Sequence, residues 1–526
     1  MSNFSKSEKE IYDLRAEKIQ FFLENYKDAF PTEFTATSNI KDIVTKHADL
    51  EEAEYSGVDV QVRGRILNGR SFGKLSFFDL LDDSGKIQLL VDSKTLSEPD
   101  ITLFSKYDTG DIIGVRGEIM KTKKGQLSIK VSSSAILSKS LRTLPEKWHG
   151  LKDKETRFRQ RYLDFIVNPD AKQTIQIRSK VINSIRQFMH SEDFIEVETP
   201  ILQPKAGGAI AKPFITHHNA LDVDMYLRIA PELYLKRMII GGFEKVFELG
   251  RVFRNEGIDQ THSPEFTMME SYQAYTNGNG VIKMVEDMCR TVFEDLQLGY
   301  DISFDEKNAD FSFPWTKASM FTLVSEELNM KVKVDSNFKE IAEELSKKDI
   351  DVNNDIKTIG HLVYDLFERF VEDKIINPTF VTDYPVEVSP FARNSKDSPN
   401  ITERFELFAF GSELANGFSE LIDPVEQEER LKSQAMKKEL GDEEAHVEDM
   451  DYIEALEHAL PPTGGLGFGI DRFVMMLTGN TSIREVVAFP HLKPENLLLL
   501  CIKYSFKLFK ISVIFLISIF FIASLL

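Results

Sequence analysis

Cysteine is scarce in this chain, and its scarcity excludes two kinds of cross-linked protein. Only Cys289 and Cys501 occur among the 526 residues. Two cysteines cannot build a disulfide framework or a cysteine-rich zinc site, and they fit a reducing compartment. The opening segment, MSNFSKSEKEIYDLRAEK, also lacks the apolar core of a secretory signal. The expected localisation is therefore cytoplasmic.

Positive charge is also in short supply. The chain has 64 Lys and Arg against 84 Asp and Glu, a net charge of −20, which argues against indiscriminate binding of nucleic acid. Residues 63–147 are the exception, because 15 basic and 10 acidic residues give them a net of +5 and leave −25 for the remainder. A basic module attached to an acidic body suits a polyanion that is held at one place. The length predicts two or three domains.

Two further motifs for metal or phosphate binding are missing. His217 and His218 are neighbours on a predicted strand, so they point to opposite faces and cannot easily share a metal ion. The glycine-rich segment GGLGFGIDRF lacks the Lys-Ser/Thr pair of a P-loop, and no βαβ unit precedes it. It instead predicts a glycine-rich strand that runs into a helix.

The basic region has the pattern of a small barrel. Five short strands separated by Gly and Asp turns indicate an OB-type fold, which binds oligonucleotides on one face. Phe77 and Phe78 project to opposite faces, so one can pack in the core and the other can stack on a base. Gln88 offers donors and acceptors for a base edge. A structural barrel with every Phe in its core is the alternative. The predicted strands span residues 58–67, 74–82, 85–92, 111–120 and 126–137.

The segment 247–275 predicts an antiparallel hairpin with a long loop. Its strands are FELGRVFRN and EFTMMESYQAY, joined by EGIDQTHSP. Alternation places Phe266, Glu270 and Tyr272 on one face of the second strand. Arg254 at the end of the first strand can grip a phosphate or carboxylate in a bidentate manner. The alternative is an amphipathic hairpin with a solvated, charged tip.

A second group of polar residues lies in the segment 403–424. Glu406 and Glu413 are expected on facing or adjacent turns, and they suit Mg²⁺, which takes one or two carboxylates together with substrate phosphates. Asn416, Phe418 and Glu420 alternate on one strand face, and Glu420 suits a buried partner for a substrate ammonium. A pair of surface glutamates is the alternative for the two expected metal ligands.

These segments resemble the motifs of one enzyme family. Residues 247–275 resemble motif 2 of class II aminoacyl-tRNA synthetases, and their sequence looks like that of the lysyl enzymes. The helix and strand at 173–200, ending at Pro200, match motif 1, and GLGFGIDRF matches motif 3. The barrel resembles the anticodon-binding domain of subclass IIb. The resemblance to bacterial-type lysyl-tRNA synthetases covers roughly residues 11–495 and implies an α+β protein. It would have a five-stranded OB-type barrel and then a catalytic domain with a central antiparallel sheet flanked by helices.

The resemblance also implies partners and residue roles. The partners would be ATP, L-lysine, tRNA(Lys), Mg²⁺ on Glu406 and Glu413, and a second copy in a homodimer, because motif 1 builds a two-fold interface in the family. Arg254 and Arg472 would be catalytic, and Phe77 and Gln88 would contact the anticodon. ATP would be bound by Arg254, Glu256, His262, Phe266 and Arg472. Lysine would be held by Gly208, Glu232, Glu270, Tyr272, Asn416, Phe418 and Glu420. Thr261 stands where some members have a second basic residue, so the source of that phosphate contact stays open.

The expected organisation has five parts. They are an N-terminal helical segment at 1–55 with a helix near 8–28, the barrel at 56–140, a linker at 141–172, the catalytic domain at 173–495 and an apolar tail at 496–526. In the tail, residues 511–526 carry no charge and span roughly 24 Å as a helix, short of the ~30 Å bilayer core. Weak membrane association, a packing helix and a non-native extension stay open.

Two other functions remain as alternatives at this point. A subclass IIb enzyme for aspartate or asparagine would share the fold and the ATP site, but the acidic Glu232, Glu270 and Glu420 would repel an acidic substrate. A non-catalytic RNA-binding paralogue would be expected to lose Arg254, Arg472 or the metal carboxylates, and all of these are present.

Overall fold

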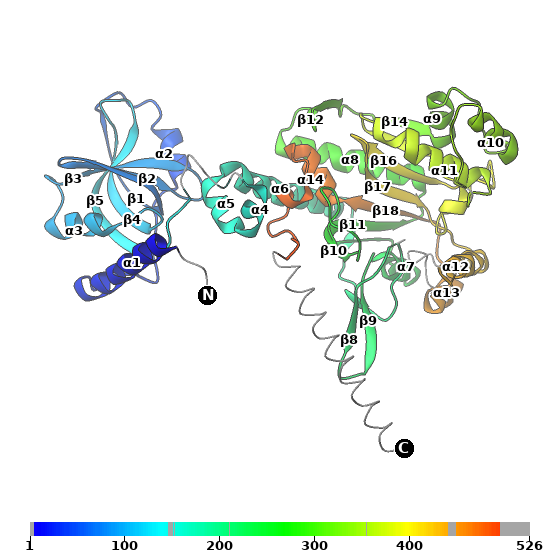
Figure 1. The fold of residues 1–526 in the computed structure, drawn as a ribbon, viewed down its shortest axis with the longest axis horizontal. Coiled ribbons are helices and arrows are strands. Elements are labelled where there is room, and N and C mark those ends of the chain that lie inside the picture. Colours follow the sequence, from blue (N-terminus) through cyan, green and yellow to red (C-terminus); the bar gives the residue numbers. More distant parts are fainter. Residues whose placement is uncertain are drawn as a thin grey trace, which may run out of the picture. The chain divides into compact units, whose positions relative to one another are not determined.

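The computed structural model describes residues 5–145, 151, 153–209, 211–353, 355–439 and 449–494. The chain forms two compact units, Met1–Lys152 and Asp153–Leu526, each shown in Figure 1. The tail at 496–526, on which the membrane hypothesis depends, lies outside the described residues. Within the described ranges, no helix has both the length and the apolarity needed to cross a bilayer.

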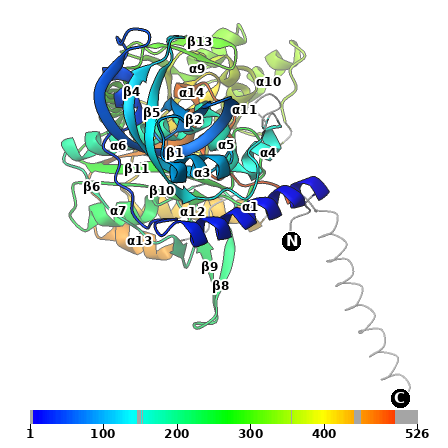
Figure 2. The same cartoon turned by 90° about the vertical axis from the view of Figure 1, so that its left-hand side faces the viewer.

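The first unit is a closed five-stranded barrel with strand order β1-β2-β3-β5-β4 (Figure 2). Alternation sets its inner face: Val60 and Val62 are buried, whereas Asp59 and Arg63 are exposed. The prediction of five strands is confirmed. The strands are β1 Tyr55–Phe72, β2 Leu75–Leu81, β3 Lys86–Asp92, β4 Ile112–Lys121 and β5 Leu127–Ser138.

Three helices pack on this barrel: α1 Lys6–Asn25, α2 Ile40–Lys46 and α3 Glu98–Lys106. The predicted N-terminal helix is α1. Phe22 of α1 is fully buried in the barrel core. Arg15 donates to the backbone carbonyls of Thr109, Ser140 and Arg142, which lie just before β4 and just after β5. The N-terminal segment and the barrel therefore share one core.

The second unit is built on an eight-stranded sheet with order β14-β15-β16-β17-β18-β11-β10-β6. Neighbouring strands are antiparallel except in the pairs β14–β15 and β10–β6. The expected catalytic domain with a central antiparallel sheet is confirmed. The strands are β6 Ile195–Glu196, β10 Lys245–Phe253, β11 Glu265–Ala274, β14 Thr316–Ser319, β15 Thr379–Thr382, β16 Arg404–Ala409, β17 Ser412–Ser419 and β18 Thr463–Gly469.

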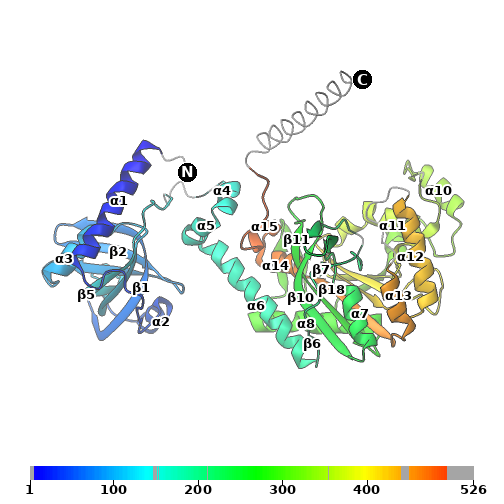
Figure 3. The same ribbon diagram turned by 90° about the horizontal axis from the view of Figure 1, so that it is seen from below.

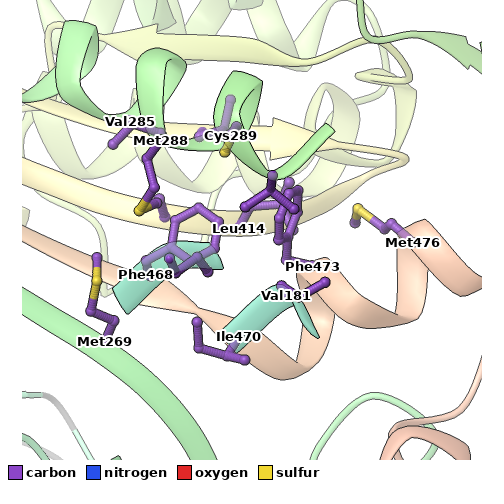
Figure 4. Packing of buried hydrophobic residues seen from close by; sticks show 14 of the residues in the cluster. Val181, Met269, Val285, Met288, Cys289, Leu414, Phe468, Ile470, Phe473 and Met476 are labelled. Atoms are coloured by element: carbon purple, nitrogen blue, oxygen red, sulfur yellow. The ribbon is translucent and has the colours of Figure 1, made fainter. Parts of the chain in front are cut away.

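Helices α6 Pro169–Ser191, α8 Gly278–Leu296 and α14 Ile470–Thr478 cover one face of this sheet. Figure 4 shows their shared core, where Val181, Met288 and Phe473 meet Met269 and Phe468 of the strands. Because strand side chains alternate, the other face of β11, β17 and β18 is left to line a cavity.

The strand predicted at 195–200 is wrong in length, because β6 has only two residues. It pairs with β10 through Ile195 and Glu196. The backbone then leaves the ladder: the Thr199 N–H donates to the Glu248 carboxylate at 3.0 Å instead of to a strand. Pro200 follows, which cannot donate to a sheet.

The remaining elements surround the sheet. In Figure 3, α7, α12 and α13 lie together at one side of the unit. A three-stranded sheet of order β7-β9-β8 projects from the unit (Figure 1). The bounds are α4 Lys154–Arg159, α5 Arg161–Val167, β7 Leu202–Gln203, β8 Ile215–His218, β9 Val223–Leu227, α7 Glu232–Ile240, β12 Asp301–Phe304, β13 Lys307–Asp310, α9 Met320–Glu327, α10 Phe338–Ser346, α11 Ile359–Phe370, the 3₁₀ helices Glu372–Lys374 and Val386–Val388, α12 Pro424–Glu439, α13 Met450–Glu457 and α15 Ile483–Val486.

Candidate active site

A cavity of about 650 Å³ lies on the face of the sheet that α6, α8 and α14 leave open. Every site residue predicted in the catalytic unit lines it except Glu420. The predicted residues on its wall are Gly208, Glu232, Arg254, Glu256, His262, Phe266, Glu270, Tyr272, Glu406, Glu413, Asn416, Phe418 and Arg472. The hairpin β10–β11 is present as predicted, with Val252 opposite Phe266.

Arg254 is placed for an anionic ligand. The backbone N–H of Arg254 donates to the Pro264 carbonyl at 2.9 Å, and the guanidinium group lies 5.1 Å from the centre of the Phe266 ring. Among the described residues its buried Nε has no hydrogen-bond partner. Burial lowers the pKa of Arg254, although the nearby glutamates oppose this effect. A buried, unpaired N–H is costly, so this atom is suited to an oxygen of a bound phosphate or carboxylate.

His262 and Arg472 come together although they are far apart in sequence. Arg472 Nη2 lies 3.4 Å from His262 Nε2, and Arg472 Nη1 donates to the Glu413 carbonyl at 2.7 Å. Asp259 orients the imidazole at 2.8 Å from Nδ1. Slight burial alone raises the pKa of Asp259, but hydrogen bonds from His262 and Thr261 outweigh it and lower that pKa to about 2. Arg254 and Arg472 bring two guanidinium groups to this part of the cavity, which defines its cationic part.

Helix α14 is fixed to the hairpin by a buried network. Asp471, next to Arg472, accepts from Arg178 of α6 and from the Thr267 N–H at 2.7 Å. Arg178 also donates to Thr267 Oγ1 at 2.9 Å. Both oxygens of Asp471 are thereby used, and the first turn of α14 is held against β11 with Arg472 on the cavity wall.

Glu406 and Glu413 lie on the neighbouring strands β16 and β17, not on the turns that the sequence interpretation expected. Glu406 accepts from Tyr384 at 2.8 Å and from Arg404 at 2.5 Å. Burial, with the charge of Glu413 added, raises the pKa of Glu406 to about 7, although Arg404 opposes the shift. Sequence reasoning missed Arg404, whose alternation with Glu406 was the available signal.

The carboxylate pair fits Mg²⁺ held jointly with substrate phosphates. Both side chains line the cavity, and Glu413 is within 3.6 Å of Arg472 in its cationic part. In the described part of the chain, no group of three or more His, Cys, Asp or Glu side chains is arranged around a metal position. Two carboxylates without a full protein cage are the usual protein share of a Mg²⁺ site that phosphates complete.

The far part of the cavity is acidic. Glu232 and Glu270 are 6% and 4% exposed, and the Tyr272 hydroxyl donates to Glu270 Oε2 at 3.2 Å. Gly208 has a φ of +88°, and a Cβ there would lie 2.9 Å from the Cβ of Glu232. Glycine at 208 therefore permits both the left-handed backbone and the close approach to Glu232. Phe266 and Glu270 are separated by roughly 13 Å along the strand, so the cationic and acidic parts are distinct.

Glu420 lies behind the cavity wall and is 1% exposed. Its Oε2 is 2.5 Å from the Nζ of Lys236, which also contacts Glu232 Oε1 at 2.5 Å. Sequence reasoning missed Lys236. The signal was its position one helical turn after Glu232, within the buried stripe of α7.

The two residues expected to contact the anticodon lie on the same face of the barrel, on adjacent strands. Phe77 is opposite Leu90, and Gln88 is opposite Asp79. Phe77 is half-buried against Phe72, which is 66% exposed. Gln88 is only 7% exposed, and its Oε1 accepts from Ser128 at 3.0 Å. This face therefore carries one exposed and one half-buried aromatic ring, while the side-chain carbonyl of Gln88 is already bonded.

The sheet, its three motifs in chain order and the cavity lined by motifs 2 and 3 define a class II aminoacyl-tRNA synthetase. The chain matches the family model "tRNA synthetases class II (D, K and N)" over residues 153–493 and an "OB-fold nucleic acid binding domain" over residues 60–137. It belongs to the lysine–tRNA ligase family of these synthetases, as its relatives show.

Relatives with this name include those of the following three organisms. The lysine–tRNA ligase of Prochlorococcus marinus subsp. pastoris is 46% identical over 92% of this chain and 97% of its own length. That of Nostoc sp. is 45% identical over 95% of this chain and 90% of its own. That of Synechococcus sp. is 45% identical over 93% and 98%.

Proposed function

We propose that this chain activates L-lysine with ATP and transfers the lysyl group to the 3′ end of tRNA(Lys). The observation that carries the proposal is the division of one cavity into a cationic part around Arg254 and an acidic part around Glu232 and Glu270. ATP brings phosphates to the first, and lysine brings two ammonium groups to the second. An aspartate substrate would place a third carboxylate among buried glutamates, which is unfavourable.

The ATP site is proposed around β11 and α14. Arg254 binds the α-phosphate and the lysine carboxylate, which brings the nucleophile to the phosphorus. Phe266 stacks on adenine, and Glu256 accepts from its exocyclic amine. His262 and Arg472 bind the γ-phosphate, with Thr261 beside them. Glu406 and Glu413 would hold Mg²⁺, which offsets negative charge on the phosphates when it is bound.

The lysine site is proposed around α7, β11 and β17. Gly208 and Glu232 hold the α-ammonium group. Asn416 and Phe418 line the path of the side chain, and Glu270, Tyr272 and Glu420 recognise the ε-ammonium. A desolvated cation needs paired oxygens, and these side chains supply them.

The reaction then proceeds in two steps. A lysine carboxylate oxygen attacks the α-phosphorus, the bond to the bridging oxygen breaks, and pyrophosphate leaves with its electron pair. The terminal tRNA hydroxyl next attacks the lysyl carbonyl carbon and loses its proton, and AMP leaves. Positioning and electrostatic stabilisation carry the rate, because little acid–base chemistry is needed.

The barrel is proposed to bind the anticodon. The family model supports a nucleic-acid-binding role for this unit. Phe77 and Phe72 offer stacking surfaces, and Gln88 contributes if its amide rotates from Ser128 toward a base.

We also propose a homodimer in the cytoplasm. The β7–β9 sheet and the preceding β6 expose an unusual number of apolar side chains for one small region. A second copy of the chain would cover this surface. The exposed residues are Ile195, Ile201, Leu202, Ile215, Leu221 and Val223.

Lysine-dependent ATP–pyrophosphate exchange tests the proposal. The full chain and a chain cut after Glu495 are assayed with lysine, aspartate and asparagine. Exchange with lysine alone, equal in both chains, is expected. Exchange with aspartate or asparagine would contradict the assigned substrate. No exchange in a folded protein would indicate an RNA-binding paralogue instead.

A further inference from the structure

The ammonium group of Lys236 lies between two carboxylates that we assign to substrate recognition. Its Nζ is 2.5 Å from Glu232 Oε1 and 2.5 Å from Glu420 Oε2, and the side chain is fully buried. Lys236 does not line the cavity, so it lies in the layer behind the wall. A buried cation with two carboxylate partners fixes the position of both of them.

Four aromatic rings enclose this cation. Its Nζ is 4.8 Å from the ring centre of Phe391, 5.5 Å from Phe418 and 5.8 Å from each of Tyr272 and Tyr452. Burial by itself lowers the pKa of Lys236, but Glu232 and Glu420 outweigh that effect and raise it. The charged form of Lys236 is therefore favoured, and full burial separates it from water.

Each carboxylate keeps its second oxygen for another partner. Glu420 Oε2 contacts Lys236 as an ion pair without a hydrogen bond, and Oε1 is buried with no hydrogen-bond partner among the described residues. A Cβ placed on Gly465, which lines the cavity, would lie 2.0 Å from this oxygen. Glu232 Oε2 lies 3.6 Å from the corresponding position on Gly208, another wall residue. The two remaining oxygens thus lie beside glycines at two places on the wall.

We propose that Lys236 is a positioning residue that couples recognition of the two amino groups of lysine. It holds one oxygen each of Glu232 and Glu420 and leaves the other oxygen of each for the α-ammonium and the ε-ammonium. This inference rests on the proposed function. Glu270 is the third buried carboxylate beside these groups, so when lysine is bound and Glu270 is ionised, one internal ammonium and the two of the substrate balance three negative charges.

Two half-substrates, which are lysine analogues that keep one ammonium group each, distinguish the positioning role of Lys236 from a packing role. 6-Aminohexanoate carries only the ε-ammonium, and 2-aminohexanoate carries only the α-ammonium; both are measured as competitive inhibitors of lysine in the exchange reaction. Lys236→Met is expected to raise both inhibition constants about tenfold or more, because both carboxylates lose their anchor. Glu420→Gln is expected to raise mainly the first constant and Glu232→Gln mainly the second. The KM for ATP should stay within about twofold in all three.

A second buried lysine supplies the control. Lys139 of the barrel unit contacts Asp108 and lies 2.7 Å from Asp111, and its side chain is 1% exposed. Lys139→Met removes the same kind of ion pair but should leave both inhibition constants unchanged.

Lys236→Arg keeps the charge but displaces both carboxylates, and it is assayed if Lys236→Met does not fold. It should raise both constants together.

Three results would overturn the inference. Tighter lysine binding by Lys236→Met would show that Lys236 competes with the substrate for Glu420. Equal losses for ATP and for both half-substrates would show only a packing role. A change in one half-substrate alone would show that the two carboxylates are not coupled. By contrast, a wild-type chain without lysine-dependent exchange would contradict the proposed function itself.

Discussion

Glu232, Glu270 and Glu420 are each less than a tenth exposed, and burial raises the pKa of all three carboxyl groups. Residues of this kind are expensive to bury unless a cation accompanies them. Lys236 accompanies two of them, and the remaining negative charge defines what the site can bind. At the residue scale, the choice of substrate thus follows from unbalanced buried charge.

Replacement of Glu420 should separate lysine recognition from ATP recognition. Glu420→Gln keeps the shape but removes a charge-assisted interaction, so the KM for lysine should rise roughly tenfold to a hundredfold. The KM for ATP should hardly change. Glu256→Gln is the reciprocal variant and should raise the KM for ATP alone. Steady-state exchange kinetics measure both constants, and a parallel rise of the two in Glu420→Gln would refute the assignment.

Lysine binding should release protons. In the empty site, burial and then the charge of Glu232 raise the pKa of Glu270 well above its ordinary value, so its neutral form is favoured. A bound ammonium stabilises the ionised form and lowers that pKa. Affinity for lysine should therefore increase as the pH rises toward the raised pKa. The other titratable groups in the buried surroundings of Glu270 are Glu232, Glu420, Lys236, Tyr272 and Arg254.

Calorimetry in two buffers of different ionisation enthalpy measures the number of protons released. Glu270→Gln should lower that number, while Glu232 and Glu420 continue to contribute. Identical binding heats in both buffers for the wild-type chain would contradict the prediction.

Strand β18 shows how an element, rather than a residue, shapes the cavity. In its sequence TGGLGFG, Gly465, Gly467 and Gly469 line the cavity and alternate with Leu466 and Phe468, which are buried in the core. Because these glycines have no side chains, the Glu420 carboxylate can approach the cavity wall from the protein interior. The following helix, α14, then presents Arg472 while Asp471 fixes its first turn.

A methyl group on this strand should block the lysine end. In Gly465→Ala the new Cβ would lie 2.0 Å from Glu420 Oε1 and 2.7 Å from Tyr272 Cε1. Overpacking of this kind costs about 1–3 kcal/mol in stability, and the KM for lysine should rise while the KM for ATP rises less. Gly299→Ala is the matched control, because nothing lies within 4 Å of its Cβ position. Unchanged lysine kinetics in a folded Gly465→Ala protein would contradict the proposed location of the amino-acid site.

At the scale of the whole molecule, the two units have separate cores and separate chemistry. The barrel core gathers residues from Phe22 to Ile136, and the cavity is lined only by residues of the second unit within the described ranges. The net positive charge of the barrel region and the acidic remainder agree with this division.

Separation of the units should therefore separate the two steps. Residues 153–494 alone should retain lysine-dependent ATP–pyrophosphate exchange, since every cavity residue is present. Charging of tRNA should fall much further, because the barrel no longer contributes to tRNA binding. Exchange and charging assays on the same preparation check this. Equal charging by the fragment and the full chain would show that the barrel is not needed for tRNA recognition.

The sequence by itself determined the local elements and, through the family resemblance, thirteen of the residues that line the cavity. Period-two alternation and turn residues act over a few positions, so the barrel strands, the β10–β11 hairpin and the β18–α14 junction were all predicted. The resemblance to a known family named residues that proved to line one cavity, but alternation alone had already placed Phe266, Glu270 and Tyr272 on one face.

The tertiary structure decided what depends on distant neighbours. Whether Lys236 faces water or two carboxylates, and whether Gln88 is free or bonded to Ser128, follows from which strands and helices pack together. The short β6 likewise follows from the side chain of Glu248, about fifty residues away. Burial and pairing of polar groups are set by desolvation across the whole fold, and no local pattern in the chain encodes them.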